Sequence, residues 1–314
     1  MADISSLDLS QVKRELIQAN WDCSIRGLIH GATRAAELAY CLKTTKDTDG
    51  DIPKISQLDF QQEHDVYMLA KSYFDLKEYL RAVHFLKQSE FTSSVTYFLY
   101  MYARYLADEK RRSYNMTDSF TSMGASVIND DLARIKVLKT ELSTKHRKKE
   151  LDGFCLYLYG VVLKKLDLLK EATNVLLEAV HQEPLHWGAW QELNTLIPDK
   201  ETLLSLSLPN HWIKHLFLAH MYSELQHTDE ALKIYQKFVD NGFANCTYIQ
   251  AQIAIAHDNS RSFDQAVEVF MKLRDIDPYR LENMDIFSNI LFVKENRMEL
   301  AYLAHNVCEI DKYI

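Results

Sequence analysis

Apolar residues recur along this chain at the three- and four-residue spacing of amphipathic helices, and small residues recur among them at a fixed interval. In the 34-residue window that begins at Gly153, small residues occupy positions 8 and 20, which are Gly160 and Ala172. Large apolar residues occupy positions 4, 7, 11 and 24, and Pro184 occupies position 32. Small residues let two helices approach closely, large ones fill the space around them, and the proline ends the second helix. The window therefore predicts a pair of antiparallel helices.

The pair of small residues recurs with a constant gap of twelve positions. It is found at Ala70/Ala82, Gly160/Ala172, Ala219/Ala231 and Ala254/Ala266, with a weaker copy at Ser288/Leu300. This is the tetratricopeptide (TPR) pattern, in which each repeat is one helix-turn-helix unit that buries its apolar face against its neighbours. We predict an all-α TPR solenoid, wound as a right-handed superhelix, rather than an ordinary helical bundle.

Between the clear repeats the pattern is irregular, and this divides the chain. We expect two helices, Leu9–Trp21 and Gly31–Leu42, in an N-terminal segment that lacks a clean pair of small residues. Two polar stretches with weak periodicity are expected to be loop inserts. The predicted organisation is an atypical N-terminal helical repeat (1–43), a linker (44–62), TPR helices (63–107), a flexible insert (108–130) and a TPR array (131–314).

The last repeat window closes at Ile314, and no solvating helix follows it. Repeat arrays normally end on a capping unit with a polar outer face. We therefore expect an array that is truncated at its C-terminus, as in a fragment of a longer solenoid.

The N-terminal segment is more apolar than a terminal repeat normally is. Its apolar residues include Leu7, Leu9, Trp21, Ile25 and Leu28. Two interpretations stay open: these side chains pack on the first clear repeat, or they also contact a second chain.

Composition agrees with long helices and excludes several classes of protein. The 314 residues contain only 8 Gly and 5 Pro, which argues against a β-rich fold. The net charge of −8 lacks the basic excess of a nucleic-acid-binding protein, and the longest apolar run, Phe154–Leu163, is about half a membrane span. The five cysteines form no Cys-x-x-Cys motif, which favours free thiols in a reducing compartment. We expect a soluble protein of nucleus and cytoplasm that binds neither nucleic acid nor membrane.

Candidate chemistry is sparse. The sequence has no phosphate-binding glycine loop and no nucleophile elbow. Three aspartates between positions 47 and 51 resemble part of a calcium-binding loop, but its bidentate glutamate is missing. His211 and His215 have the four-residue spacing of a zinc-binding pair, and His220 follows, yet no obvious third ligand is placed beside the pair. We interpret these histidines as surface or packing residues, Cys155 as an inert buried thiol, and the chain as a non-enzyme without cofactor, metal or small-molecule substrate.

The remaining candidate surface is the concave groove, which TPR arrays line with positions 2, 5, 9 and 12 of the first helix of each repeat. These positions are mainly aromatic and aliphatic here, and the basic clamp that chaperone-cofactor TPR domains use for a peptide carboxylate is absent. The groove residues that we single out are Phe154, Tyr157, Val161, Leu216, Tyr248 and Ile255. An apolar groove suits a partner helix. The alternative is that neighbouring helices of a tight superhelix cover it.

Several stretches resemble one family more closely than the TPR consensus requires. The most specific are HWGAW at 186–190 and DPYRLENMDIFSN at 277–289, and further similarity lies at 67–86, 97–111 and 150–172. By these motifs the chain resembles the subunit 8 family of the anaphase-promoting complex, the cell-division-cycle-23 homologues of animals. The resemblance covers most of the chain and is weakest in the two inserts.

The resemblance implies a non-catalytic scaffold subunit of a multi-subunit cullin-RING-type ubiquitin ligase that acts in mitosis. Its partners would be a second copy of itself and other subunits of that complex, and the N-terminal helices of each copy would enter the groove of the other. The expected contacts join Leu9, Val12, Leu16, Trp21 and Leu28 of one chain to Tyr67, Lys71, Phe74 and Tyr102 of the other. The alternative is a monomeric TPR adaptor that binds a partner helix or peptide in its concave groove.

Overall fold

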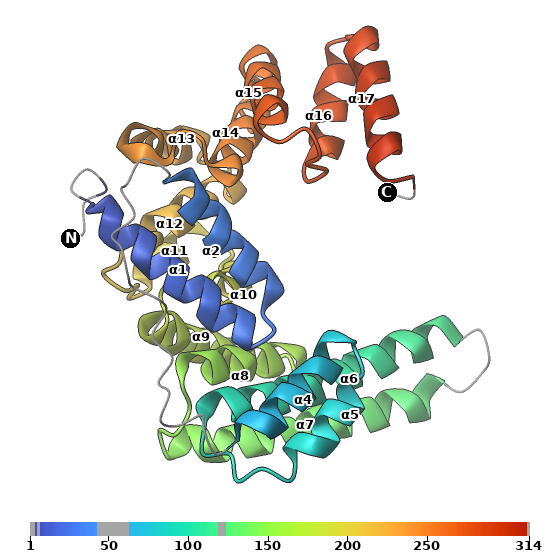
Figure 1. Ribbon diagram of the computed structural model, residues 1–314. Helices are drawn as coiled ribbons and strands as arrows, with labels where there is room; N and C mark the ends of the chain where they lie inside the picture. The colour runs from blue at the N-terminus through green and yellow to red at the C-terminus, as the bar shows by residue number, and fades with distance from the viewer. Residues whose placement is uncertain (1–3, 5–6, 43–62, 119–123, 313–314) are drawn as a thin grey trace.

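The computed structural model describes residue 4 and residues 7–42, 63–118 and 124–312. All regular structure in these residues is helical, which confirms the predicted all-α TPR solenoid. Figure 1 shows antiparallel helix pairs stacked into a curved array that runs from α4–α7, through α8–α13, to α14–α17. In chain order the elements are α1 (Leu9–Ile25), α2 (Ile29–Cys41), α4 (His64–Asp75), α5 (Tyr79–Leu86), α6 (Ser94–Asp118), α7 (Gly124–Arg147), α8 (Gly153–Lys165), α9 (Leu169–Gln182), α10 (Trp187–Asn194), α11 (Lys200–Ser205), α12 (Ile213–Glu224), α13 (Thr228–Phe238), the kinked turn η2 (Val239–Phe243), α14 (Thr247–Asn259), α15 (Phe263–Ile276), α16 (Met284–Val293) and α17 (Arg297–Ile310).

The turns inside the clear helix pairs share one geometry. After α8, Asp167 adopts a left-handed conformation with φ +59°. The Leu168 N–H then donates to the Leu163 carbonyl and the Asp167 N–H to the Lys164 carbonyl, each at 3.0 Å, which is a Schellman cap. The equivalent left-handed residues in other pairs are Lys77, Gln226, Arg261 and Glu295. Each stands seven residues after position 8 of its repeat, so the turn has a fixed register in the array.

The small residues predicted at the helix crossings are closely packed. A Cβ placed on Gly160 of α8 would lie 2.6 Å from Cγ of Leu176 in α9, so a larger side chain requires repacking. The alanines of the strong pairs are all fully buried: Ala70, Ala82, Ala172, Ala219, Ala231, Ala254 and Ala266. The predicted pattern thus marks the crossing point of each helix pair.

The polar segment 108–130, which we expected to be a flexible insert, differs from that prediction. Helices α6 and α7 extend through most of it and form a long antiparallel pair that projects from the array (Figure 1); the stretch between them lies outside the described residues. Ion pairs link the two helices, with Arg104 2.5 Å from Glu141 and Arg134 3.8 Å from Asp108. The apolar periodicity stops here although the backbone is helical, so polarity did not indicate a loop.

The N-terminal hairpin, defined as α1, α2 and the turn between them, does not simply extend the array at its end. It lies along the inner side of the curve (Figure 1), and α2 contacts α10, α14 and η2. Val12, Leu16 and Leu38 of the hairpin are at most 3% exposed and belong to the main core. The atypical N-terminal repeat therefore fills part of the concave groove of its own chain.

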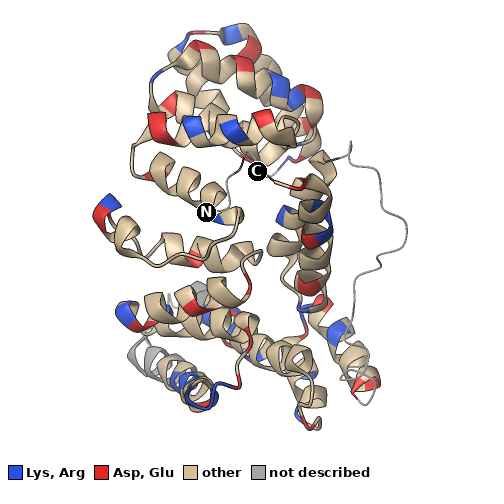
Figure 2. Cartoon of the chain, turned by 90° about the vertical axis from the view of Figure 1, so that its left-hand side faces the viewer, with Lys and Arg blue, Asp and Glu red and all other residues tan. Residues whose placement is uncertain are grey.

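Charged residues are mixed along the surface of the array. In the view of Figure 2, Lys and Arg alternate with Asp and Glu along the helices, without a single basic stripe on this side. Among the described residues, no helix is both long enough and apolar enough to cross a membrane.

Candidate functional site in the concave groove

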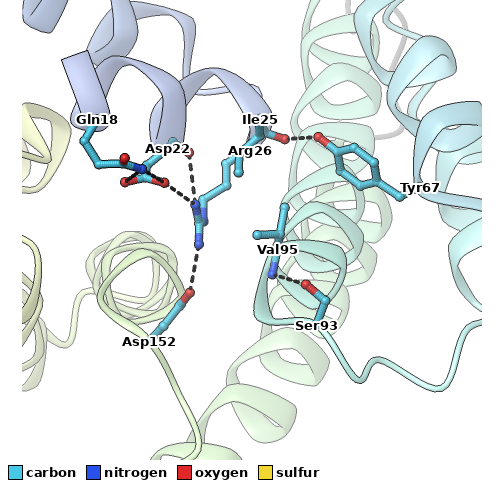
Figure 3. Close-up of polar contacts among 8 residues, drawn as sticks. All are labelled: Gln18, Asp22, Ile25, Arg26, Tyr67, Ser93, Val95 and Asp152. Atoms are coloured by element: carbon cyan, nitrogen blue, oxygen red, sulfur yellow. Dashed lines mark hydrogen bonds and ion pairs between the residues drawn. The ribbon is translucent and has the colours of Figure 1, made fainter. Parts of the chain in front are cut away.

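Arg26, at the end of α1, anchors the N-terminal hairpin to α8 (Figure 3). Its guanidinium donates to the Asp22 carbonyl at 3.1 Å and to the Asp152 carboxylate at 3.4 Å. It also stacks 4.0 Å from the ring centroid of Phe154. Asp152 caps α8 by accepting the Cys155 N–H at 2.8 Å, so its carboxylate is held in place. Arg26 is only 7% exposed, and this contact is therefore shielded from water.

The tip of the N-terminal hairpin rests on the first clear repeat. The Tyr67 hydroxyl in α4 donates to the Ile25 carbonyl at 2.5 Å (Figure 3). The turn residue Gly27 has φ +73°, and a Cβ placed on it would overlap the ring of Phe74. Glycine is required here because a left-handed backbone coincides with the close approach of an aromatic ring.

One side of α2 carries ionic contacts to the far part of the array. Arg34 stacks 3.9 Å from the ring centroid of Tyr248 in α14 and pairs with Glu37 at 2.6 Å. Glu37 also lies 3.7 Å from Arg280, whose side chain is 5% exposed in the turn between α15 and α16. Arg280 also pairs with Glu282 at 2.5 Å, so Glu37 is one of two carboxylates beside this largely buried guanidinium. These contacts tie α2 to the turn before α16.

His186 lies beneath the N-terminal hairpin at the start of the HWGAW motif. Its ring contacts Phe154 and Tyr157, with centroid distances of 5.0 and 4.5 Å. Burial lowers the pKa of His186 to about 3, so the imidazole is neutral near pH 7. A Cβ placed on Gly31 of α2 would lie 3.8 Å from Cδ2 of His186. The motif thus forms part of the floor on which α2 rests.

Carboxylates gather around Arg26. Burial, with the charges of Asp22 and Asp152, raises the pKa of Glu183 to about 7, against the opposing effect of Arg26. Burial also raises the pKa of Asp22. One guanidinium therefore faces three acidic groups, and Glu183 changes its protonation state near neutral pH.

Helix α1 is also held by the region around α12 and η2. The Glu15 carboxylate lies 3.5 Å from Nε2 of His211, and the hydrogen bond with His211 lowers the pKa of Glu15. A Cβ placed on Gly242 in η2 would lie 2.9 Å from Cδ1 of Leu9. His211, one half of the possible zinc pair in the sequence, therefore contacts the N-terminal hairpin.

The other residues that the sequence suggested for chemistry are also packed among neighbouring side chains. The His220 ring lies 3.4 Å from both Asn194 and Gln252. Cys155 is buried, and burial raises the pKa of its thiol. Within the part of the chain that the structure describes, no three His, Cys, Asp or Glu side chains are placed to hold a metal ion. The aspartates between positions 47 and 51 lie outside that part.

The groove that we predicted for a partner helix is partly occupied by the chain itself. Phe154 and Tyr248 lie under Arg26 and Arg34 of the N-terminal hairpin. Beside the hairpin a cavity of about 790 Å³ remains, and Tyr157 is among its lining residues. The predicted groove residues are all buried or half-buried: Phe154, Tyr157, Val161, Leu216, Tyr248 and Ile255.

The residues that we predicted to join two chains have contacts within one chain in this structure. Phe74 and Tyr102 lie side by side under the hairpin tip, with centroids 5.8 Å apart, whereas Lys71 pairs with Asp75 at 2.5 Å. Trp21 keeps 38% of its surface exposed. The other residues of the predicted contact are buried or half-buried: Leu9, Val12, Leu16, Leu28 and Tyr67. A contact between two copies stays a prediction.

Sequence reasoning missed the charged residues that seat the N-terminal hairpin, namely Arg26, Arg34, Glu37 and Arg280. No local pattern distinguishes a buried charge from one on a solvated helix face, so these residues gave no signal. The sequence did carry a signal for the helix pair itself: Asn20 and Ala32 are separated by the same gap of twelve positions as the small-residue pairs.

Comparison with known proteins gives a consistent result. The family model described as Anaphase promoting complex subunit 8 / Cdc23 matches residues 11–254. The chain is 50% identical to the "Cell division cycle protein 23 homolog" of Homo sapiens over 303 residues, which cover 96% of this chain and 50% of that protein. It is 44% identical to "Anaphase-promoting complex subunit 8" of Arabidopsis thaliana over 250 residues, which cover 79% of this chain and 42% of that protein.

Similarity to solved structures is weaker. "MamA 41-end from Desulfovibrio magneticus RS-1" has a TM-score of 0.32 and 14% identity, and the match covers 67% of this chain and 96% of that one. The chain spans about half the length of the curated relatives named above.

Proposed function

Because this chain belongs to the Anaphase promoting complex subunit 8 / Cdc23 family, we propose that it is a non-catalytic scaffold segment of the anaphase-promoting complex. In this proposal the complex is a cullin-RING-type ubiquitin ligase in nucleus and cytoplasm, and two copies of the chain pair through their N-terminal hairpins. The chain's partners are then a second copy and other subunits of the complex.

The observation that carries the proposal is the position of the two most specific family motifs. His186 of HWGAW lies under α2, and Arg280 of DPYRLENMDIFSN pairs with Glu37 of α2. The TPR consensus requires neither contact, because it concerns packing between the helices of adjacent repeats. Both motifs on which the resemblance rests thus contact α2 of the N-terminal hairpin.

The groove residues that hold the N-terminal hairpin of their own chain can also hold the hairpin of a second copy. Residues 43–62 separate α2 from α4, and roughly 20 residues of chain reach about 65 Å when extended. A hairpin that leaves its own groove can make identical contacts in the groove of a second copy, and the exchange is self-complementary about a two-fold axis. In that arrangement Ile25 and Gly27 of one chain contact Tyr67 and Phe74 of the other.

The outer face of α1 offers an additional contact. Ile17 and Trp21 stand one turn apart and are 40% and 38% exposed. Aromatic side chains of this kind are enriched among the residues that dominate binding energy at interfaces. We place Trp21 at the contact between the two hairpins of the pair.

Sedimentation equilibrium of the reduced chain over a concentration series tests the proposal. A pair has a mass near twice 36.6 kDa, and its interface should bury about 2,000 Å² or more. A mass of one chain at every concentration would contradict pairing by this segment.

A second function, a monomeric TPR adaptor, has one observation in its favour. The cavity of about 790 Å³ beside the N-terminal hairpin is lined by Phe74, Tyr102 and Tyr157, among others. A partner segment can enter there without displacement of the hairpin. A monomeric chain that keeps its hairpin docked would favour this function.

A further inference from the structure

A pocket of about 350 Å³ opens on the surface between the start of α5 and the second half of α6 (Figure 1). Its walls include the apolar side chains of Tyr79, Leu80, Ala107 and Tyr114. Leu80 is 63% exposed and Tyr114 is 60% exposed, and exposed apolar side chains that share one concave site are typical of binding surfaces. The pocket therefore offers apolar contact to one aliphatic or aromatic side chain from another molecule.

The lining of this pocket is also positively charged. Four of the described residues that line it are cationic and one is anionic: Lys77, Arg81, Lys110 and Arg111 against Glu78. Four cations and one anion leave a local charge of +3, whereas the whole chain carries a net charge of −8. We call this site the basic pocket. Its charge is opposite in sign to that of the protein as a whole, and it is complementary to an acidic ligand.

Most of the positive charge is not neutralised by the pocket's own residues. Arg81 and Glu78 pair with each other at 2.6 Å. The Lys110 ammonium donates to the Lys77 backbone carbonyl at 3.1 Å, and this acceptor carries no net charge. Within the described residues, no hydrogen bond or ion pair takes up the side-chain ends of Lys77 and Arg111. Three cations thus lie beside the apolar walls without a carboxylate from the part of the chain that the structure describes.

We propose that the basic pocket binds an acidic peptide segment of another protein. One leucine or aromatic side chain of the segment enters between Leu80 and Tyr114. Flanking aspartate and glutamate carboxylates then pair with Lys77, Lys110 and Arg111. None of the lining residues belongs to the N-terminal hairpin, so this binding goes beyond the proposed function and does not require that two copies pair.

Nucleic acid fits the basic pocket less well than an acidic peptide does. Nucleic acids bind through many phosphates along an extended basic surface, whereas the unpaired cations here are confined to one small site. The Arg81 guanidinium already donates to Glu78 at 2.6 Å and to the Tyr73 hydroxyl at 2.8 Å, so Arg111 alone is left for two-point contact with a phosphate. The Leu80 side chain favours an apolar side chain over a phosphodiester.

Fluorescence anisotropy of labelled heptapeptides with the full chain tests the proposal. Each acidic peptide has three glutamates on either side of a central leucine, phenylalanine or alanine, and one control peptide has phenylalanine between lysines. The leucine and phenylalanine peptides should bind at least about tenfold more tightly than the alanine peptide, and the lysine peptide should not bind. Added salt should weaken binding, because it screens exposed charges. Equal affinity for alanine and phenylalanine, or no binding of any acidic peptide up to about 1 mM, would overturn the proposal.

Matched variants locate the binding in the basic pocket. Arg111→Glu should weaken it at least about tenfold, whereas Arg112→Glu makes the same charge change at the next residue and should weaken it less than about threefold. Arg112 pairs with Glu109 and does not line the pocket. Leu80→Ser should also weaken binding, and Leu76→Ser is its control because Leu76 is 67% exposed outside the pocket. Circular dichroism should show unchanged helix content in all four variants.

The remaining outcomes separate the possible occupants. Equal loss of affinity in a variant and its control would show that the peptides bind elsewhere, and would overturn the proposal. Labelled oligothymidine that binds more tightly than every peptide, and that Arg111→Glu releases, would assign the pocket to nucleic acid. Sedimentation equilibrium of Arg111→Glu should give the same mass as the unchanged chain, whereas lost self-association would assign the pocket to a second copy.

Discussion

The side-chain amide of Asn20 donates a hydrogen bond to the backbone carbonyl of Ala32 at 2.8 Å. Asn20 stands seven residues before Gly27, whose left-handed turn matches the turns of the clear repeats. Asn20 and Ala32 therefore occupy positions 8 and 20 of a TPR unit. The N-terminal hairpin has TPR geometry, with a polar contact in place of a contact between two small residues.

Asn20→Ala should destabilise the N-terminal hairpin, because the variant loses this hydrogen bond. We expect a decrease of about 1 kcal/mol in the free energy of unfolding, measured by urea denaturation. Gln11→Ala is a matched control on the same helix, since the Gln11 side chain donates to Glu15 in an exposed position, and its effect should stay within about 0.5 kcal/mol. Equal losses of unfolding free energy in the two variants would show that the Asn20 hydrogen bond stabilises the hairpin no more than an exposed contact does.

Gly27→Ala should dislodge the tip of the N-terminal hairpin. The added Cβ combines an unfavourable left-handed backbone with overlap of the Phe74 ring, and we expect a loss of about 1–3 kcal/mol in unfolding free energy. Phe74→Leu in the same chain should recover part of the loss by making room. If the double variant is no more stable than Gly27→Ala, overlap with Phe74 is not the cause.

Arg26→Met should be strongly destabilising, because it leaves Asp152 and the nearby acidic groups without their buried cation. We expect about 3 kcal/mol in unfolding free energy, measured by urea denaturation at pH 7. Arg81→Met is the control, because Arg81 pairs with Glu78 on the surface and its side chain is 56% exposed. A loss for Arg26→Met as small as that of the control would contradict the anchoring role.

Trp21→Arg tests the proposed pairing of two copies. If Trp21 lies at the centre of the contact, the dissociation constant should rise roughly 30-fold, which corresponds to about 2 kcal/mol. Leu204→Arg introduces the same charge at a more exposed apolar position on α11, 66% exposed, and should leave association unchanged. Both constants are read from sedimentation equilibrium, and an unchanged value for Trp21→Arg would remove Trp21 from the interface.

Glu183 and His186 should give the fold opposite dependences on pH. The pKa of Glu183 is raised to about 7 in the folded chain, so its stabilising contribution is present at low pH and is lost as pH rises toward 7. The pKa of His186 is lowered to about 3, so its contribution is present above about pH 6.5 and is lost as pH falls. Between pH 5 and 6.5 the two effects oppose each other.

Substitution separates these two effects. In Glu183→Gln only the histidine effect remains, and stability should rise with pH from 5 to 6.5 by up to about 1.4 kcal/mol per pH unit. In His186→Gln stability should fall from pH 5 to 7. Urea denaturation at half-unit pH steps measures both profiles. A Glu183→Gln profile parallel to that of the unchanged chain would show that Glu183 is not buried as the structure has it.

The sequence predicted the helix pairs but not the extent of the longest one. Gly160 and the alanines of the strong pairs mark helix crossings, where only small side chains fit, and such positions repeat at a fixed gap. Helices α6 and α7 carry few apolar positions along their outer turns. An ion pair joins Arg134 of α7 to Asp108 of α6 near these turns, and polar helices of this kind resemble loops in composition.

Local spacing and composition by themselves determined the all-α TPR fold, the family resemblance and the apolar character of the groove, because each of these depends on residues close together in sequence. Tertiary structure alone decided what lies in the groove. The contacts of Arg26 with Asp152, Arg34 with Tyr248, and Glu37 with Arg280 join residues that are distant in the chain. A buried charge and its partner can be identified only in the folded array, because its curvature brings them together.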